Sequence, residues 1–263
     1  MFDFPITQGN PPEVLSDINN IIISEKVAKK YFTYIGYDDA DKRVGVVTSL
    51  PTAGESASPT VAKNAHTRIT QLCGLAEKGK IAPLIMVDNE KIKKLYPKLT
   101  VKKFWTTINN TVAGLFHVFN VLANQDSEYT TFDATDYDSI MKQPGCMIMG
   151  VTSVKNLENE TAVSSALKKN LEKTLLAEGF DLTTATGAAC IVVGSEEIFE
   201  ETVGLMDNIE FGFDTLAALT GGAMVHRGIY EDDKKDKLVT YTLVSGLKRP
   251  AKRIEGLKKF LKK

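Results

Sequence analysis

The stretch Leu84-Ile85-Met86-Val87-Asp88-Asn89 places four apolar residues before two polar ones. A short apolar run that ends in polar residues is typical of a strand buried on both faces of a parallel sheet. A similar run covers residues 44–50 and stops at Pro51. Helical patterns follow these strands over residues 60–77, 90–95 and 100–122. This alternation of strand and helix predicts a doubly wound α/β domain.

The second half of the chain has a different order of elements. Its patterns predict strands over residues 146–151, 188–193, 223–230 and 238–245, and helices over 160–177 and from Glu196 onward. Phe199, Val203 and Met206 would form the apolar face of the second helix. The polar residues 231–236 predict a hairpin loop between the last two strands. We therefore expect a smaller β-α-β-α-β-β unit joined to the first through the long helix, and a further helix over residues 13–31.

Composition places the chain among ordinary soluble globular proteins. Its 263 residues are 43% hydrophobic and 25% charged, which suits one large or two modest domains. The three cysteines lie far apart without metal-ligand spacing, so we expect reduced thiols and a cytoplasmic location. We find no signal-peptide pattern and no apolar run of the ~18–20 residues that span a bilayer. His66, His117 and His226 lack an acid or Cys at metal-ligand spacing, which predicts structural roles and no metal site.

Three polar side chains lie where an α/β protein would bind a purine. Asn89 follows a buried strand, and ligands of parallel sheets bind beyond the carboxyl ends of strands. Its amide can both donate and accept hydrogen bonds, although Asn89 could instead cap the next helix. Trp105 and Asn109 are four residues apart, so they share one face of the long helix. An aromatic surface beside an amide suits a purine, while the alternative places Trp105 in the core.

Together with Thr131-Phe132-Asp133-Ala134-Thr135-Asp136, these positions resemble the motifs of the tubulin/FtsZ superfamily in order and spacing. The resemblance covers residues 44–246 and is nearer to FtsZ and TubZ than to eukaryotic tubulin, whose C-terminal helices are missing. It implies that Asn89, Trp105 and Asn109 contact guanine. It also implies that Asp133 and Asp136 belong to a synergy loop that reaches the next subunit and polarises the water attacking the γ-phosphate. Alternatively or in addition, these carboxylates cap a helix that ends near residue 143.

The resemblance has consequences for architecture and function. It implies a tubulin/FtsZ-like α/β fold: residues 1–99 as the rear part of a GTP-binding domain, 100–124 as the core helix, 125–247 as synergy loop and activation domain, and 248–263 as a basic tail. The implied function is a filament-forming cytoskeletal GTPase subunit, assembled head to tail, in cell division or plasmid DNA partitioning. GTP or GDP with Mg²⁺ would be its cofactors. Two positions depart from the family pattern: Trp105 replaces Phe or Tyr, and Thr131 replaces Asn.

The phosphate-binding motif of the family has no clear counterpart in the chain. The family holds phosphates with a Gly-Gly-Gly-Thr-Gly-Thr-Gly loop before a helix, and only residues 8–15 resemble the end of such a loop. We therefore expect weak GTP binding and poor GTP hydrolysis unless the phosphate-binding part is supplied. The alternative is a nucleotide-free protein of the same fold that interacts with filaments or regulates them.

The last sixteen residues carry eight Lys or Arg against one Glu. Three interpretations are open for this basic tail. It is a solvated end, a short helix that binds an adaptor or acidic partner, or a segment that contacts anionic lipid or nucleic acid. The second interpretation assigns partner binding to Lys252, Arg253, Lys258 and Lys259.

Overall fold

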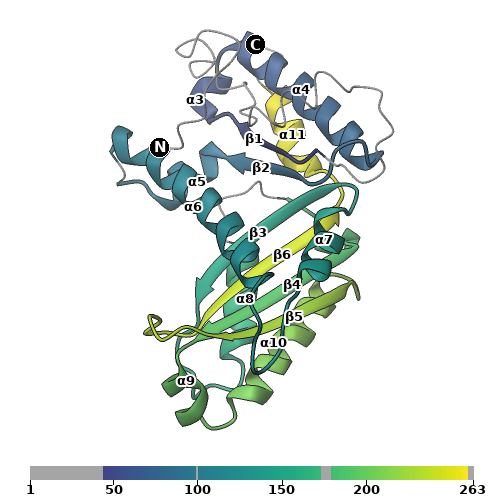
Figure 1. Ribbon diagram of the computed structural model, residues 1–263. Coiled ribbons are helices and arrows are strands. Elements are labelled where there is room, and N and C mark those ends of the chain that lie inside the picture. Colours follow the sequence, from purple (N-terminus) through teal and green to yellow (C-terminus); the bar gives the residue numbers. More distant parts are fainter. Residues whose placement is uncertain (1–43, 99, 173–178, 260–263) are drawn as a thin grey trace.

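The computed structural model describes residues 44–98, 100–172 and 179–259. Its strands form one mixed six-stranded sheet in the order β1-β2-β3-β6-β4-β5 (Figure 1). The strands are β1 (Val46–Leu50), β2 (Leu84–Asp88), β3 (Cys146–Ser153), β4 (Gly187–Gly194), β5 (Met224–Glu231) and β6 (Val239–Leu247). The helix predicted over residues 13–31 lies outside the described residues.

Helices connect and cover these strands, and the predicted strand–helix alternation of the first half is confirmed. The helices are α3 (Ala53–Ser56), α4 (Pro59–Glu77), α5 (Asn89–Leu95), α6 (Val101–Leu122), α7 (Ala134–Met141), α8 (Ala162–Glu172), α9 (Glu196–Glu201), α10 (Leu205–Leu219) and α11 (Ala251–Lys258), with a 3₁₀ turn over Leu182–Thr184. In Figure 1, α3, α4 and α11 accompany β1 and β2, while the four longer strands form the lower part of the molecule.

The two halves are joined by more than the long helix. Strand β2 pairs with β3 in parallel at Leu84 and Cys146, so the sheet is continuous between them. The ring of Phe119, fully buried on α6, lies 6.4 Å from those of Phe132 and Tyr137 and 6.3 Å from that of Tyr241 on β6. The expected separate unit is therefore packed onto α6 through an aromatic cluster.

The predicted hairpin between the last two strands is wrong. Strand β4 lies between β5 and β6, pairing with β5 in parallel and with β6 antiparallel. All eight residues of β4 are buried, which suits a central strand with neighbours on both edges. Residues 231–236 therefore lead into a crossover past β4 instead of a tight turn.

The helix expected to run from Glu196 through Met206 is divided into α9 and α10. Gly204 stands between them with φ +74°, a left-handed conformation that favours glycine. Val203 is 98% exposed, so it does not belong to an apolar helix face. The second helix instead packs on α8 at Gly212, where an added Cβ would lie 2.5 Å from a methyl carbon of Val163.

Candidate functional site

The Thr131–Asp136 stretch forms a loop that enters α7. Asp133 is the N-cap of that helix: its Oδ1 accepts a hydrogen bond from the Asp136 backbone N–H at 2.8 Å. The Asp136 carboxylate contacts the Asp133 N–H in return, at 3.4 Å, which completes a capping box. The helix-capping alternative is therefore present in the structure. Asp133 stays exposed and the Asp136 side chain is 29% exposed, so capping leaves both carboxylates accessible.

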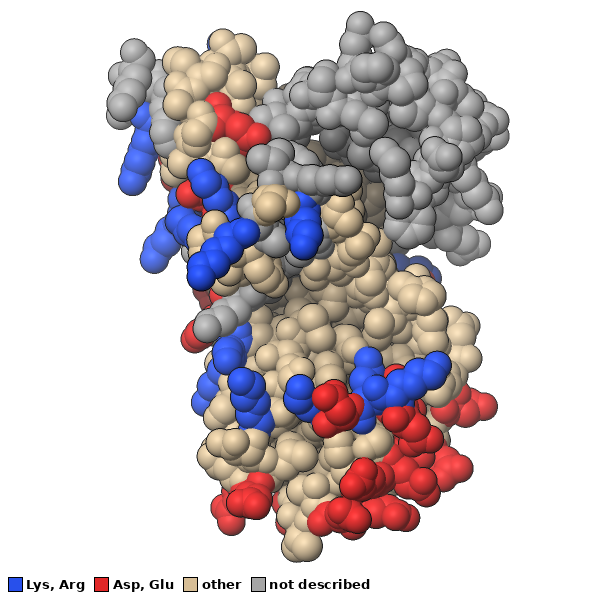
Figure 2. Space-filling model, turned by 90° about the vertical axis from the view of Figure 1, so that its left-hand side faces the viewer, with Lys and Arg blue, Asp and Glu red and all other residues tan. Residues whose placement is uncertain are grey.

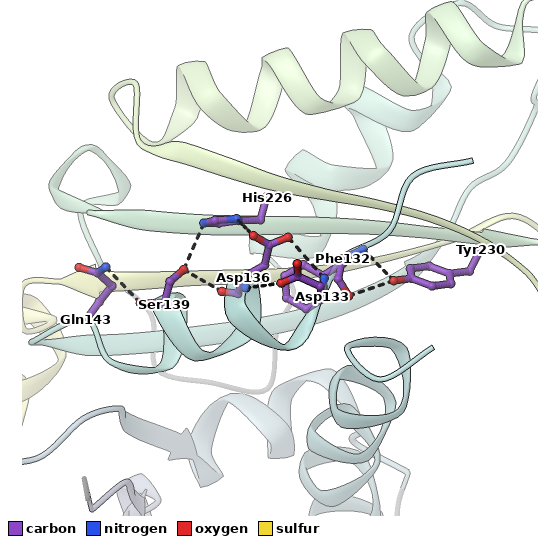
Figure 3. A network of polar contacts seen from close by, with 7 residues as sticks. All are labelled: Phe132, Asp133, Asp136, Ser139, Gln143, His226 and Tyr230. Carbon is purple, nitrogen blue, oxygen red and sulfur yellow. Dashed lines mark hydrogen bonds and ion pairs between the residues drawn. The ribbon is translucent and has the colours of Figure 1, made fainter. Parts of the chain in front are cut away.

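A second partner holds Asp136 from the neighbouring strand. His226 on β5 places its Nδ1 2.7 Å from Oδ1 of Asp136 and its Nε2 3.3 Å from Oγ of Ser139 (Figure 3). The Ser139 hydroxyl also donates to the Asp136 carbonyl at 2.8 Å. The sequence shows no acid or Cys at metal-ligand spacing from His226, because its partner Asp136 lies 90 residues away.

Tyr230 anchors the start of the same loop. Its hydroxyl oxygen accepts from the Phe132 N–H at 2.8 Å, and it donates to the carbonyl of Leu122 or Phe132, each 3.0 Å away. Burial raises the pKa of Tyr230, and the carboxylates of Asp133 and Asp136 act in the same direction. The hydroxyl therefore keeps its proton and remains a donor around neutral pH.

Gly228 lies between these two anchors on β5. An added Cβ there would be 2.8 Å from the Tyr230 ring and 3.0 Å from Cβ of Phe132. Alternate strand residues point to the same face, so His226, Gly228 and Tyr230 share one face of β5. That face supports the loop. The sequence signal that could have revealed this face is the i, i+2, i+4 spacing of the three residues in a predicted strand.

At the predicted guanine contact, Asn89 is the first residue of α5 and is 1% exposed. The cap of that helix is Asp88, which accepts from the N–H groups of Glu90 and Lys91. Asn89 is thus not the cap. Its amide Nδ2 has no hydrogen-bond partner among the described residues. A buried donor without a partner costs about 1–3 kcal/mol, so this amide fits a ligand that accepts a hydrogen bond, as a guanine edge does.

The other predicted guanine contacts lie on α6. Asn109 is exposed there, and the side chain of Trp105 is not among those the structure describes. No hydrogen bond joins Asn109 to Asn89 in the described part of the chain. In Figure 1, α5 lies at the left of the upper strands and α7 at the right of the sheet. The predicted base contacts and the two carboxylates thus lie on different elements, and they are called the two half-sites below.

The basic tail is part of the fold as far as the structure describes it. Helix α11 buries Ile254 and Leu257, and Arg253 makes a bidentate ion pair with Asp88, with N–O distances of 2.7 and 3.0 Å. Arg253 also donates to the Pro51 carbonyl at 2.8 Å. Partner binding through Arg253 therefore conflicts with its internal role, whereas Lys252, Lys258 and Lys259 remain exposed. The spacing of basic residues could not reveal an acid 165 positions away.

We expect Arg253→Ala to lower the free energy of unfolding by about 2–3 kcal/mol, because the Asp88 carboxylate, 4% exposed, would lose its charged partner. The estimate allows for the 19% exposure of Arg253 itself. Urea denaturation measures the change. Lys258→Ala, which breaks an exposed pair with Glu255 on the same helix, is the control and should cost under about 1 kcal/mol. Equal losses for the two variants would show that the Asp88 pair is not important for stability.

Figure 2 shows acidic residues gathered on the lower part of the viewed face, with most of the basic side chains above them.

Among the described residues, no three His, Cys, Asp or Glu side chains form a group that could hold a metal ion. Within the same residues, no helix combines the length and apolar character needed to cross a membrane.

Residues 130–251 match the family model described as "Tubulin-like protein TubZ, C-terminal domain". One similar sequence is a carbohydrate ABC transporter substrate-binding protein of Streptococcus pneumoniae serotype 4. It is 31% identical over 159 residues, which are 60% of this chain and 29% of that protein. That coverage is too small for its name to describe this chain.

Solved structures match across most of the chain. TubZ of Bacillus thuringiensis serovar israelensis in GDP-form protofilaments gives a TM-score of 0.72 at 17% identity, covering 90% of this chain and 60% of that one. CetZ2 from Haloferax volcanii gives 0.66 at 16% identity, covering 90% and 66%. The FtsZ dimer of M. jannaschii gives 0.57 at 19% identity, covering 78% and 58%.

The chain thus spans about 60% of the length of the TubZ structure that it matches. Identities this low establish the fold, and the family match over residues 130–251 adds the sequence relationship. The chain therefore has a tubulin/FtsZ-like fold, and its residues 130–251 are similar in sequence to the C-terminal domain of TubZ.

Proposed function

We propose that the chain is a subunit of TubZ-type filaments and presents its Asp133–Asp136 loop to nucleotide held by the next subunit. The observation that carries the proposal is the loop itself. Two accessible carboxylates are fixed at the N-terminus of α7 by a capping box and by His226 on β5. Rigidly placed carboxylates are suited to position a water molecule. In phosphoryl transfer the protein contributes mainly such positioning and electrostatic stabilisation.

The arrangement of the half-sites supports head-to-tail assembly. Helix α5, which begins at Asn89, and helix α7, which follows the loop, lie on different sides of the molecule in Figure 1. A head-to-tail contact brings one side of a subunit to the other side of its neighbour. TubZ of Bacillus thuringiensis forms protofilaments in GDP and GTPγS forms, and filaments of two and four strands. We propose the same assembly here, in the cytoplasm.

The described residues fit the base of a guanine nucleotide better than its phosphates. The unpaired amide of Asn89 would contact the base edge, with Asn109 and Trp105 as further proposed contacts. No glycine-rich phosphate loop occurs among residues 44–98, 100–172 and 179–259. When bound to the neighbouring subunit, GTP with Mg²⁺ supplies the γ-phosphate that is hydrolysed, and this chain supplies the carboxylates.

Among the processes that the superfamily serves, we favour DNA partitioning. One matching structure is a type III plasmid segregation TubZ, with a TM-score of 0.71 at 17% identity. The second candidate is a nucleotide-free protein that regulates filaments. The missing phosphate loop in the described residues favours it, and the exposed Lys252, Lys258 and Lys259 on or beside α11 offer a contact for an acidic partner.

The proposal is tested by mixing. The chain is titrated into a complete TubZ-type GTPase at fixed concentration, and GTP turnover is followed by phosphate release. We expect turnover to change in proportion to the chain bound, because the added loop meets the nucleotide of the complete protein. Unchanged turnover at saturating chain would rule out an activating loop. Filament growth by the chain with GTP, followed by light scattering, separates the two candidates, since the regulatory protein should show none.

A further inference from the structure

We infer that His226 is a positioning residue for the activating loop: it holds Asp136 through Nδ1 and so sets the direction in which that carboxylate faces a neighbouring subunit. The inference rests on the proposed function, because it assigns a role within the same loop. It concerns a histidine that lies on a different element from the carboxylate and 90 positions away in the chain.

The hydrogen bond between His226 and Asp136 has a defined donor and acceptor. The Ser139 hydroxyl has one proton, and it donates that proton to the Asp136 carbonyl at 2.8 Å. Nε2 lies 3.3 Å from Ser139 Oγ. The Asp136 carboxylate only accepts, so Nδ1 donates to it at 2.7 Å. The contact between His226 and Asp136 is therefore a hydrogen bond donated by the ring.

The pair restricts the carboxylate at both oxygens. Oδ1 of Asp136 accepts from His226, while Oδ2 receives the Asp133 N–H at 3.4 Å. The second contact is long and weak, so His226 provides the main restraint on rotation of the carboxyl group. The Asp136 side chain is still 29% exposed, which leaves part of the carboxylate open to a partner.

Strand β5 holds the loop at two points, and His226 is one of them. Tyr230 holds the backbone at Phe132, four residues before Asp136 (Figure 3). Gly228 lies between the two anchors on β5, where a side chain would collide with Tyr230 and Phe132. The two anchors do different things. Tyr230 binds main-chain atoms and determines where the loop runs, whereas His226 binds the side chain that would face the water.

Because His226 is 17% exposed and lies against Asp136, its loss should change turnover more than assembly. A carboxylate free to rotate occupies the productive direction for a smaller part of the time, and small misplacements of a positioning group are costly to the rate. We therefore expect substitution of His226 to lower the maximal turnover that the chain adds. The chain concentration that gives half of this maximum should not change.

Two substitutions separate the two ring nitrogens. His226→Asn places an amide N–H near the position of Nδ1 and keeps a donor for Asp136, whereas His226→Gln places its amide near Nε2 and loses that donor. In the mixing assay we expect the His226→Asn variant to keep at least half of the added turnover. We expect the His226→Gln variant to add about tenfold less turnover than the unmodified chain. His117→Gln, on the exposed side of α6, is the matched control and should equal the unmodified chain. Thermal unfolding of each variant confirms that it is folded.

The outcomes are distinct. If Asp136→Asn leaves the added turnover intact, the proposed function fails. If Asp136→Asn removes it but His226→Gln behaves as the unmodified chain, only the positioning role fails. Equal loss in the Asn and Gln variants, with equally lowered unfolding temperatures, would make His226 a purely structural residue and would also overturn the inference. Loss of the added turnover in the His226→Gln variant alone, with an unchanged half-maximal chain concentration, supports the inference.

Discussion

Asp136→Asn is expected to remove about 99% of the turnover that the chain adds to a complete TubZ-type GTPase, a loss of about 100-fold. The amide has nearly the shape of the carboxylate and can still accept a hydrogen bond from His226. It lacks the negative charge that, in the proposed function, would polarise an attacking water. The variant should therefore fold and bind normally and fail in the chemical step, which phosphate release under saturating chain measures.

The same helix offers a control for this variant. Asp138 also lies on α7, where it forms an exposed ion pair with Lys142. Asp138→Asn removes the same charge from the same helix without touching the capping box or His226. It should keep nearly all of the added turnover. If the two variants lose equally, the effect comes from the overall charge of α7 and not from a placed carboxylate.

Phe119→Ala is expected to lower the free energy of unfolding by about 4 kcal/mol. Phe119 is fully buried, and its ring contacts Phe132 and Tyr137 beside the loop as well as Tyr241 on β6. Removing it leaves a cavity where the long helix meets the second half of the chain. The loss should appear as a lower urea midpoint. The loop at residues 131–136 should also be held less rigidly, because Phe132 and Tyr137 lose a common neighbour.

A variant two residues further along α6 shows whether the effect belongs to the core. Val121 lies on the same helix and is 44% exposed. Val121→Ala should cost less than about 1 kcal/mol, since most surface substitutions have small effects. Similar losses for Val121→Ala and Phe119→Ala would mean that the aromatic cluster does not determine the stability of this region.

The elements that sequence predicted well are those with a strong local pattern. The apolar run at residues 84–87 became β2, and the periodic stretches became α4 and α6. At residues 131–136 the helix-capping interpretation of Asp133 and Asp136 is confirmed, because both take part in the capping box of α7. These features depend on residues a few positions apart, so a single sequence is enough to find them.

What sequence could not supply depends on distant partners. In the sheet, β4 lies between β5 and β6 and is paired along both edges. An apolar run shows that a strand is buried but does not show which strands are its neighbours. The pairing of His226 with Asp136 and of Arg253 with Asp88 each joins parts of the chain far apart in sequence. The break before α10 depends on one glycine, Gly204, whose left-handed conformation interrupts an otherwise helical pattern.

The most direct measurement is co-sedimentation of the chain with filaments that a complete TubZ assembles in GTP. If the chain is a filament subunit, it should pellet with the filaments in a saturable manner, and Asp136→Asn should pellet equally because it fails only in hydrolysis. If the chain stays in the supernatant at every filament concentration while the filaments themselves pellet, it is not a subunit or partner of TubZ-type filaments, and its carboxylate loop has another role.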